Sequence, residues 1–385
     1  MTAAPVYLDY NASSPLRAEA FEAMKPWLTE KFGNPNSLHR IGQQAKVAIE
    51  RARATCASVL GCTPEEIVFT SGATESNNIG LRGLVWADRI KRGKPGLLVG
   101  GEFEHSAVRE TMKDLGKKAF TVQFLPCHAD GRMRLDGFKE KLDSAACMTL
   151  MYVNNESGVI QPVQELGALC KERGVPVHVD GTQAAGRLSL NVNEIQCTTL
   201  ALSAHKFDGP QGVGLLYVRK GTALHSPVSG GEQEHGLRGG TQNVAGIVGM
   251  AEALKLADAE GVSESSRLLT LKENFENELS ARFPKAPIHG KAAPRVTNTT
   301  FISFAGVSGE SLVSALDLEG VCVSTGAACA EGTNRPSHVL AAMGLPLEVC
   351  NSCIRFSSGK KTVAADYERA LHALTAISKR LPGMN

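Results

Sequence analysis

The chain has 385 residues, 43% of them hydrophobic and 21% charged, which is the composition of a globular protein with a large buried core. The 41 lysines and arginines nearly balance the 39 aspartates and glutamates, and this formal charge of +2 argues against direct binding of nucleic acid or a membrane surface. We expect no secretory signal and no membrane span, because no apolar run approaches the roughly 20 residues that cross a bilayer. The ten cysteines are too few for a disulfide scaffold, so we expect a cytoplasmic protein with reduced thiols.

Short β-branched runs alternate with helical segments over the first two thirds of the chain. We expect helices over residues 21–32, 41–60, 73–91, 106–115 and 163–173. The expected strands cover 67–70, 97–99, 119–125, 148–153, 175–180, 198–202 and 212–218. Repeated strand–helix–strand units predict an α/β fold in which a mostly parallel, seven-stranded sheet is covered by helices on both faces.

The pattern changes after about residue 255. A long polar helical region over 264–283 precedes shorter segments over 299–304, 310–318, 321–324, 337–343 and 353–357 and a final helix over 363–381. These segments predict a second, smaller α+β domain. We therefore expect a large domain over 13–255 and a small domain made of 1–12 and 256–385.

Ligands of strand–helix–strand domains bind at the carboxyl ends of strands, and three candidate segments end there. The first, over 69–75, enters a helix through a glycine turn, where free N–H groups and Thr74 offer a phosphate seat; taken alone, it favours an ordinary N-cap by Ser71 or Thr74. In the second, Asp180 ends an apolar strand and needs a cationic cofactor nitrogen, or else an arginine or a backbone pair. In the third, Lys206 is placed as an amine that can form a Schiff base.

Cys329 is the fourth candidate, because it lies among small residues in a polar loop rather than on an apolar stripe. The pair Cys350 and Cys353 forms a C-x-x-C without a second pair of ligands at matching spacing, so packing is favoured over a metal or redox role. Packing is also the expected role of the remaining cysteines, which are Cys56, Cys62, Cys127, Cys147, Cys170, Cys197 and Cys322. Only Cys329 is predicted to be a reactive thiol.

An aspartate at one strand end and a lysine 26 residues later at the next suit pyridoxal phosphate, which needs a protonated pyridine nitrogen and an amine for its aldehyde. Here the chain resembles the fold-type I pyridoxal-phosphate enzymes, and among them the cysteine desulfurases of the NifS/IscS type. The resemblance covers nearly the whole chain, from Tyr7 to Ser357. Its motifs follow the family's order: Thr-Ser-Gly-Ala-Thr-Glu-Ser-Asn-Asn at 70–78, Glu-His-Ser-Ala-Val at 104–108, Asn-Asn-Glu-Ser-Gly at 154–158, Arg-Gly-Gly-Thr-Gln-Asn at 238–243, and the Cys329 loop.

The resemblance implies a role for each residue that matches these motifs. Lys206 would bind the cofactor aldehyde, Asp180 would pair with the pyridine nitrogen, and Gln183 would donate to the ring hydroxyl oxygen. His105 would stack on the ring and act in catalysis with Lys206 and the nucleophile Cys329. The other implied residues hold the phosphate and the substrate carboxylate: Ala73, Thr74, Ser203, His205 and, from the other subunit of a homodimer, Thr241 for the phosphate, and Asn155 and Arg355 for the carboxylate.

The activity implied by the resemblance is conversion of L-cysteine to L-alanine, with the sulfur held as a persulfide on Cys329 and passed to an acceptor protein. That acceptor would be an iron–sulfur scaffold or a thiolation protein, and the residues name neither the acceptor nor a preference for cysteine over selenocysteine. The alternatives on the same scaffold are a selenocysteine lyase and another class V lyase or aminotransferase. A rival of another kind is a non-catalytic sulfur or iron–sulfur carrier.

Overall fold

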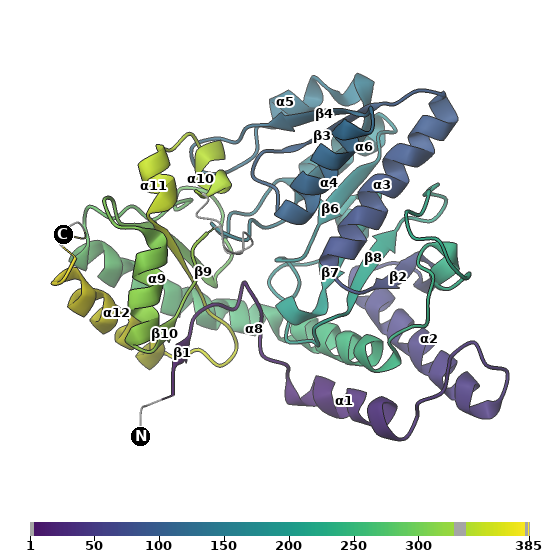
Figure 1. Ribbon diagram of the computed structural model, residues 1–385, viewed down its shortest axis with the longest axis horizontal. Coiled ribbons are helices and arrows are strands. Elements are labelled where there is room, and N and C mark those ends of the chain that lie inside the picture. The colour runs from purple at the N-terminus through teal and green to yellow at the C-terminus, as the bar shows by residue number, and fades with distance from the viewer. Residues whose placement is uncertain (1–3, 327–335, 382–383, 385) are drawn as a thin grey trace.

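The structure is a computed structural model that describes residues 4–326, 336–381 and 384. Its elements form two groups, joined by one long helix (Figure 1). We call the first group the large unit; it contains the seven-stranded sheet and the helices from α1 to α7. We call the second group the small unit; it contains two small sheets and the helices from α9 to α12.

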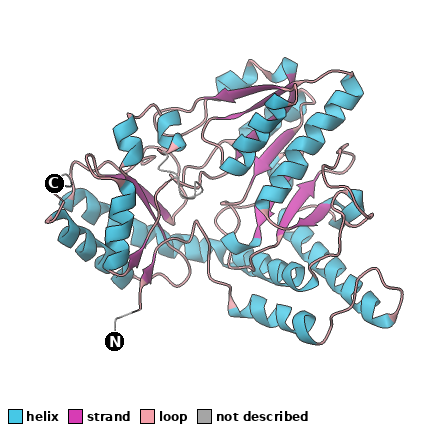
Figure 2. Ribbon diagram, in the orientation of Figure 1, coloured by secondary structure: helices cyan, strands magenta, loops and turns pink. Residues whose placement is uncertain are grey.

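The sheet of the large unit, whose strands are magenta in Figure 2, has the strand order β2-β8-β7-β6-β5-β3-β4. Strand β8 is antiparallel to both neighbours, and the other four pairs are parallel, so the prediction of a mostly parallel seven-stranded sheet is confirmed. The inner strands are buried almost throughout, as sheets covered on both faces require. The strands are β2 (Ile67–Thr70), β3 (Leu97–Gly101), β4 (Thr121–Leu125), β5 (Ala145–Met151), β6 (Val177–Asp180), β7 (Thr199–Ser203) and β8 (Gly214–Val218).

The expected helices of the large unit are present, with ends that differ from the predicted ones by three residues at most. Three short α-helices, α5, α7 and α11, were not predicted, since four or five residues are too few to show a period. Among the residues that the structure describes, no helix combines the length and the apolar character needed to cross a bilayer. The helices are α1 (Ala18–Thr29), α2 (Arg40–Leu60), α3 (Ala73–Arg92), α4 (Ser106–Lys117), α5 (Leu135–Lys139), α6 (Val163–Glu172) and α7 (Val192–Ile195), and in the small unit α9 (Gly309–Leu318), α10 (His338–Ala342), α11 (Leu347–Asn351) and α12 (Ala364–Ser378).

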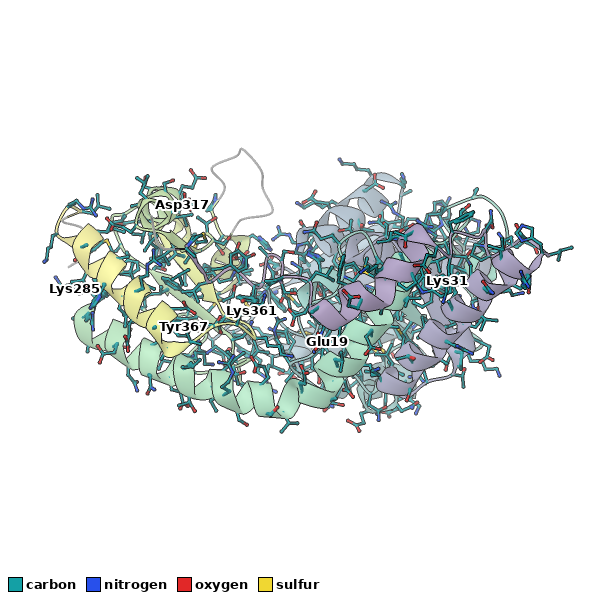
Figure 3. The ribbon with its side chains drawn as sticks, turned by 90° about the horizontal axis from the view of Figure 1, so that it is seen from below. Glu19, Lys31, Lys285, Asp317, Lys361 and Tyr367 are labelled. Carbon is teal, nitrogen blue, oxygen red and sulfur yellow. The ribbon has the colours of Figure 1, made fainter. Side chains whose placement is uncertain are left out.

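Helix α8 (Val244–Arg282) has 39 residues and runs beneath both units (Figure 3). The predicted start of this helical region at residue 264 is wrong by 20 residues, because the helix begins at Val244. Its first turns are apolar nearly all round and contain Gly246 and Gly249, so neither a helical period nor high propensity marks them. The side chain of Asn243 caps the start by accepting a hydrogen bond from the backbone N–H of Gly246 at 3.0 Å.

The small unit has its own apolar core around two small sheets. Strands β9 (Thr299–Ser303) and β11 (Cys353–Ser357) pair antiparallel, and β1 (Val6–Tyr7) pairs parallel with β10 (Val321–Cys322). Phe275 of α8 stacks on Tyr367 of α12, with ring centroids 4.4 Å apart, and Val6 and Leu8 join the same core. Residues 6–8 therefore pack with the last third of the chain.

Candidate active site

A cavity of about 620 Å³ lies at the carboxyl ends of the central strands, and residues of both units line it. Of the twelve residues predicted for the site, ten line this cavity: Ala73, Thr74, His105, Asn155, Asp180, Gln183, Ser203, His205, Lys206 and Arg355. Thr241 is not in this lining and borders a smaller neighbouring cavity with Ser71 and Gly212. Cys329 lies outside the described residues. The structure thus brings together side chains from six separate stretches of the sequence.

The start of α3 forms one end of the cavity. The N-cap expected there from Ser71 or Thr74 is wrong, because the capping position is Gly72 and no side chain caps the helix. The φ of Gly72 is 155°, and a Cβ on Gly214 would lie 2.5 Å from the Gly72 Cα, so both positions favour glycine. The uncapped N–H groups and the positive end of the helix dipole therefore adjoin the cavity, an arrangement that binds phosphate.

Lys206 follows β7 and lines the cavity. Its Nζ donates hydrogen bonds to the backbone oxygens of Asn11 and Ala12, at 2.6 and 2.8 Å. The adjacent imidazole of His205 lies 3.2 Å from the Ser13 hydroxyl, and burial together with Lys206 lowers the pKa of His205 to about 4. His205 is consequently neutral at pH 7. The contact with residues 11–13 was not foreseen, because it joins segments more than 190 residues apart.

Asp180 is buried at the end of β6 and lines the cavity. One carboxylate oxygen accepts from the Thr182 backbone N–H at 3.0 Å, and the other accepts from Asn77 Nδ2 at 2.8 Å. Within the described part of the chain, no lysine or arginine forms an ion pair with Asp180. Of the three partners considered for this carboxylate, the arginine is absent among the described residues, a backbone N–H is present, and a cation would have to come from a ligand in the cavity. A protonated ring nitrogen fits this requirement.

Gln183 is oriented by an arginine that the sequence did not reveal. Arg187 Nη1 donates to the Gln183 side-chain oxygen at 2.8 Å and to its backbone oxygen at 2.7 Å. The Gln183 amide nitrogen is left to donate, and it bonds the Asn11 backbone oxygen at 2.9 Å. This assignment of the amide agrees with the predicted role of Gln183 as a hydrogen-bond donor toward a ligand.

Arg355 lies on β11 and brings a buried positive charge from the small unit to the cavity. Its two terminal nitrogens bond the Asn155 backbone oxygen at 2.8 Å and the Asp9 carboxylate at 2.7 Å. Among the described residues, Arg355 Nε and the Asn155 side-chain oxygen have no hydrogen-bond partner. The unpartnered Arg355 Nε–H is a donor at the cavity wall, which suits a ligand that carries a carboxylate, whereas Asn155 could bind that carboxylate only through its amide nitrogen. The Asp9 contact was missed by sequence reasoning.

His105 is the N-cap of α4, where its Nδ1 accepts from the Ala107 backbone N–H at 3.1 Å. The proton of a neutral ring is therefore on Nε2. The preceding residue, Glu104, is fully buried, and one of its oxygens accepts from the Met151 backbone N–H at 2.8 Å. Burial, and secondarily Asp180, hold the pKa of Glu104 well above its usual range. Glu104 therefore holds its proton more tightly than an exposed glutamate does.

Replacement of Glu104 by glutamine tests this state through stability. A raised native pKa means that its contribution to stability is complete below about pH 4, the range of an unfolded glutamate, and is lost as pH rises toward the native pKa. We expect the unfolding free energy of the wild type to fall by roughly 1 kcal/mol per pH unit, relative to Glu104→Gln, over the lower part of pH 5–8. Urea denaturation of the full chain measures this, with the exposed neighbour variant Glu102→Gln as control. Equal pH profiles for wild type and Glu104→Gln would contradict the assignment.

The residues on either side of segment 327–335 both approach Glu156. The Ser337 hydroxyl lies 2.5 Å from a Glu156 carboxylate oxygen, and His338 Nε2 lies 2.9 Å from the Glu104 backbone oxygen. A Cβ on Gly326 would lie 2.4 Å from the same Glu156 oxygen. The chain that carries Cys329 therefore leaves and re-enters the described structure beside the cavity, which Gly326 lines.

The segment that carries Thr241 is fixed by a buried ion pair. Arg53 and Glu234 are 2.8 Å apart, with side chains 4% and 1% exposed, and Glu234 also accepts from the Phe69 backbone N–H. Glu234 and His235 have φ values of 49° and 60°, a conformation that costs free energy in residues other than glycine. Any other conformation of the segment would separate Arg53 from Glu234 and leave a buried charge without a partner, which strongly destabilises a protein. The ion pair therefore holds the segment in this conformation.

The remaining cysteines that the structure describes are free thiols. Cys353 Sγ contacts the Cys350 backbone oxygen, Cys350 Sγ contacts that of Leu345, and both side chains are buried in the core. Burial raises the pKa of Cys353 to about 12. Among the described residues, no group of three histidine, cysteine or acidic side chains is placed to hold a metal ion. Cys350 and Cys353 are thus arranged as packing residues.

Comparisons with known proteins agree over almost the whole chain. The family model described as aminotransferase class-V matches residues 6–369. A relative named cysteine desulfurase IscS, from Dictyoglomus turgidum, is 44% identical over 377 residues, which cover 98% of this chain and 95% of that protein. A solved structure named NIFS-like protein has a TM-score of 0.91 and 35% identity, and it covers 98% of this chain and 100% of its own. Another, SspA in complex with cysteine, has a TM-score of 0.81 and 32% identity, covering 93% and 99%.

Proposed function

We propose that this chain, which belongs to the aminotransferase class-V family, acts as a cysteine desulfurase through the residues of the cavity, and that Cys329 receives the sulfur. The enzyme depends on pyridoxal phosphate, as its family does. L-cysteine and the Cys329 thiol react to give L-alanine and a persulfide on Cys329. The observation that carries the proposal is the shared cavity, in which Lys206, Asp180 without a cation, and the uncapped start of α3 face one another.

The residues present fit the cofactor. The uncapped N–H groups of α3, with Thr74, Ser203 and His205, would hold the phosphate. Asp180 would pair with the protonated ring nitrogen, and Lys206 would bind the aldehyde carbon. When bound, pyridoxal phosphate supplies an electron sink for the bonds at the Cα of the amino acid.

The chain's own residues then divide the work on the substrate. Arg355 and Asn155 bind the carboxylate and fix the orientation of the Cα–H bond toward Lys206. The Lys206 amine takes this proton and later returns it to the carbon fragment. The Cys329 thiolate attacks the substrate sulfur, so that an S–S bond forms as the C–S bond breaks, and the carbon fragment takes up protons and leaves as L-alanine.

We further propose a cytoplasmic homodimer that passes sulfur to an acceptor protein. Thr241 does not line the cavity of its own chain, which favours a contribution to the phosphate site of a second copy. Free thiols throughout the described chain suit a reducing compartment. An iron–sulfur scaffold or a thiolation protein is the proposed acceptor, since relatives carry the name IscS. We also propose the division into a large domain over 13–255 and a small domain over 1–12 and 256–385, with α8 crossing the boundary.

The test of the proposed function is a single-turnover reaction. The purified chain is loaded with pyridoxal phosphate and mixed with one equivalent of L-cysteine labelled with radioactive sulfur, without reductant. We expect one equivalent of L-alanine and a label on Cys329 that dithiothreitol releases. Release of pyruvate, or of free sulfide with an unlabelled chain, would instead indicate another class V lyase, and turnover of selenocysteine alone would indicate a selenocysteine lyase.

A further inference from the structure

A row of hydrogen bonds extends from Asp180 into the protein, away from the cavity. Asp180 bonds Asn77 Nδ2 at 2.8 Å, and Asn77 Oδ1 lies 2.8 Å from His178 Nε2. His178 Nδ1 in turn lies 2.8 Å from the Thr199 hydroxyl. Asn77, His178 and Thr199 are 0% exposed, and none of them lines the cavity. The mechanism described above uses none of these three residues.

The donors in this row all point toward Asp180. An ionised carboxylate can only accept, so Asn77 presents its amide nitrogen to Asp180 and its amide oxygen to His178. Because an amide oxygen can only accept, His178 carries a proton on Nε2. Burial lowers the pKa of His178 to about 4, so the ring is neutral at pH 7 and its Nδ1 accepts from Thr199. Each hydrogen bond in this row polarises and strengthens the next one, and the last bond is donated by Asn77 to the Asp180 carboxylate.

The backbone is arranged to make this contact possible. His178 and Asp180 are two residues apart on β6 and so project from the same face of the sheet, the face that α3 covers. A Cβ on Gly80 of α3 would lie 2.7 Å from His178 Nδ1, so glycine at this position lets the helix approach the ring. Among the described residues, the charged group that acts on His178 is Asp180. The second carboxyl near Asp180 is that of Glu104, whose pKa is raised by burial.

We propose that His178 is a positioning residue for the cofactor, which acts through Asn77 to hold Asp180 oriented and ionised for the ring nitrogen. The inference rests on the proposed function. Helix α3 contributes the phosphate seat from its first turn and Asn77 from its second, so the row also fixes the distance between the two ends of the cofactor site. Without the donor on His178, Asn77 is free to turn its oxygen toward Asp180, which favours the protonated carboxyl.

The experiment compares three variants by their binding of pyridoxal phosphate. His178→Leu removes both ring nitrogens at similar volume, and His178→Gln restores an N–H at the position of Nε2. His289→Leu is the matched control, because His289 is also buried, is bonded to the hydroxyl of Ser303 as His178 is to that of Thr199, and lies in the small unit away from the cavity. For each we measure the dissociation constant of the cofactor, the visible absorption spectrum of the loaded protein, and the melting temperature of the cofactor-free protein.

We expect His178→Leu to raise the dissociation constant about tenfold, in the range for a lost hydrogen bond to a charged group, and to shift the visible spectrum. His178→Gln should restore both, and His289→Leu should change neither, although both leucine variants lower the melting temperature. An unchanged constant and spectrum in His178→Leu would overturn the inference, as would an equal loss in His289→Leu. A wild type that binds no pyridoxal phosphate would overturn the proposed function first.

Thr199→Val decides the matter if His178→Leu does not fold. Valine has nearly the shape of threonine, and it removes only the hydroxyl at the far end of the row. We expect a smaller weakening of cofactor binding, about threefold, with the same direction of spectral shift. A spectrum and a dissociation constant equal to those of the wild type would show that the row does not act on Asp180.

Discussion

Lys206→Ala is expected to abolish covalent attachment of pyridoxal phosphate and to lower turnover of L-cysteine by at least about 10³-fold, in the range for a lost general base. Lys206 supplies the only lysine amine among the described residues that line the cavity. Its Nζ donates hydrogen bonds to the backbone oxygens of Asn11 and Ala12, and all three residues line the cavity. The adjacent His205 is bonded to the Ser13 hydroxyl, and an imidazole offers no primary amine to bind the cofactor aldehyde.

The measurement for Lys206→Ala is reduction with borohydride followed by mass spectrometry of the peptide that contains residue 206. The wild type should retain the cofactor on this peptide, and the variant should retain none. Lys255→Ala is the control, because Lys255 is a surface residue paired with Glu252. Retention of the cofactor on the variant chain at wild-type level would contradict the assignment of Lys206.

Cys329→Ala is expected to leave pyridoxal phosphate bound with its normal spectrum while abolishing sulfur transfer. The S–S bond of the persulfide needs a thiolate at this position, and alanine offers none. The loss of desulfuration should reach about 10³-fold or more, whereas the rate of exchange of the substrate's Cα proton with solvent should persist, because Lys206 is intact. Lys206→Ala and Cys329→Ala therefore separate removal of the Cα proton, which needs the amine, from transfer of sulfur, which needs the thiol.

The control for Cys329→Ala is Cys322→Ala. Cys322 is partly exposed on β10, near the start of the loop, and burial followed by Asp317 raises the pKa of its thiol, which makes it a weak nucleophile. Labelled sulfur should appear on the Cys322→Ala chain and not on the Cys329→Ala chain. The reverse result would move the persulfide to Cys322, seven positions upstream in the sequence.

Periodicity and composition predicted most of the elements, and physical reasons explain the exceptions. The strands of the large sheet are continuous apolar runs between helices, which is how strands buried on both faces read. The first turns of α8 were missed because a helical segment buried nearly all round loses the amphipathic period that marks it. Short helices such as α7 depend on tertiary packing and on a cap, here Asn191, rather than on a run of propensity.

Site residues could be predicted from the sequence where a single local motif identifies them. Contacts between segments that are far apart in the sequence could not be predicted. Lys206 and Asp180 each stand at the end of a recognisable strand, and the structure places both at one cavity. Asp9 and Arg355 are 346 residues apart, and Asn77 and Asp180 are 103 apart, so no local pattern connects them. His178 had a signal that could have been used, since it alternates with Asp180 on one strand and so shares its face.

The length of α8 has a consequence for how such a chain can vary. Its first turns pack against the large unit and its last turns against the small unit, whereas Val262 in its middle is 83% exposed. One residue inserted in that exposed stretch would rotate everything after it by about 100° and advance it by about 1.5 Å, since the helix itself would continue unbroken. Arg355 in the small unit would then lose its hydrogen bond to the Asn155 backbone oxygen in the large unit. The number of residues in the middle of α8 thus sets the rotation of the small unit relative to the large unit. The exposed residues there can be substituted, but none can be inserted or deleted without moving the small unit.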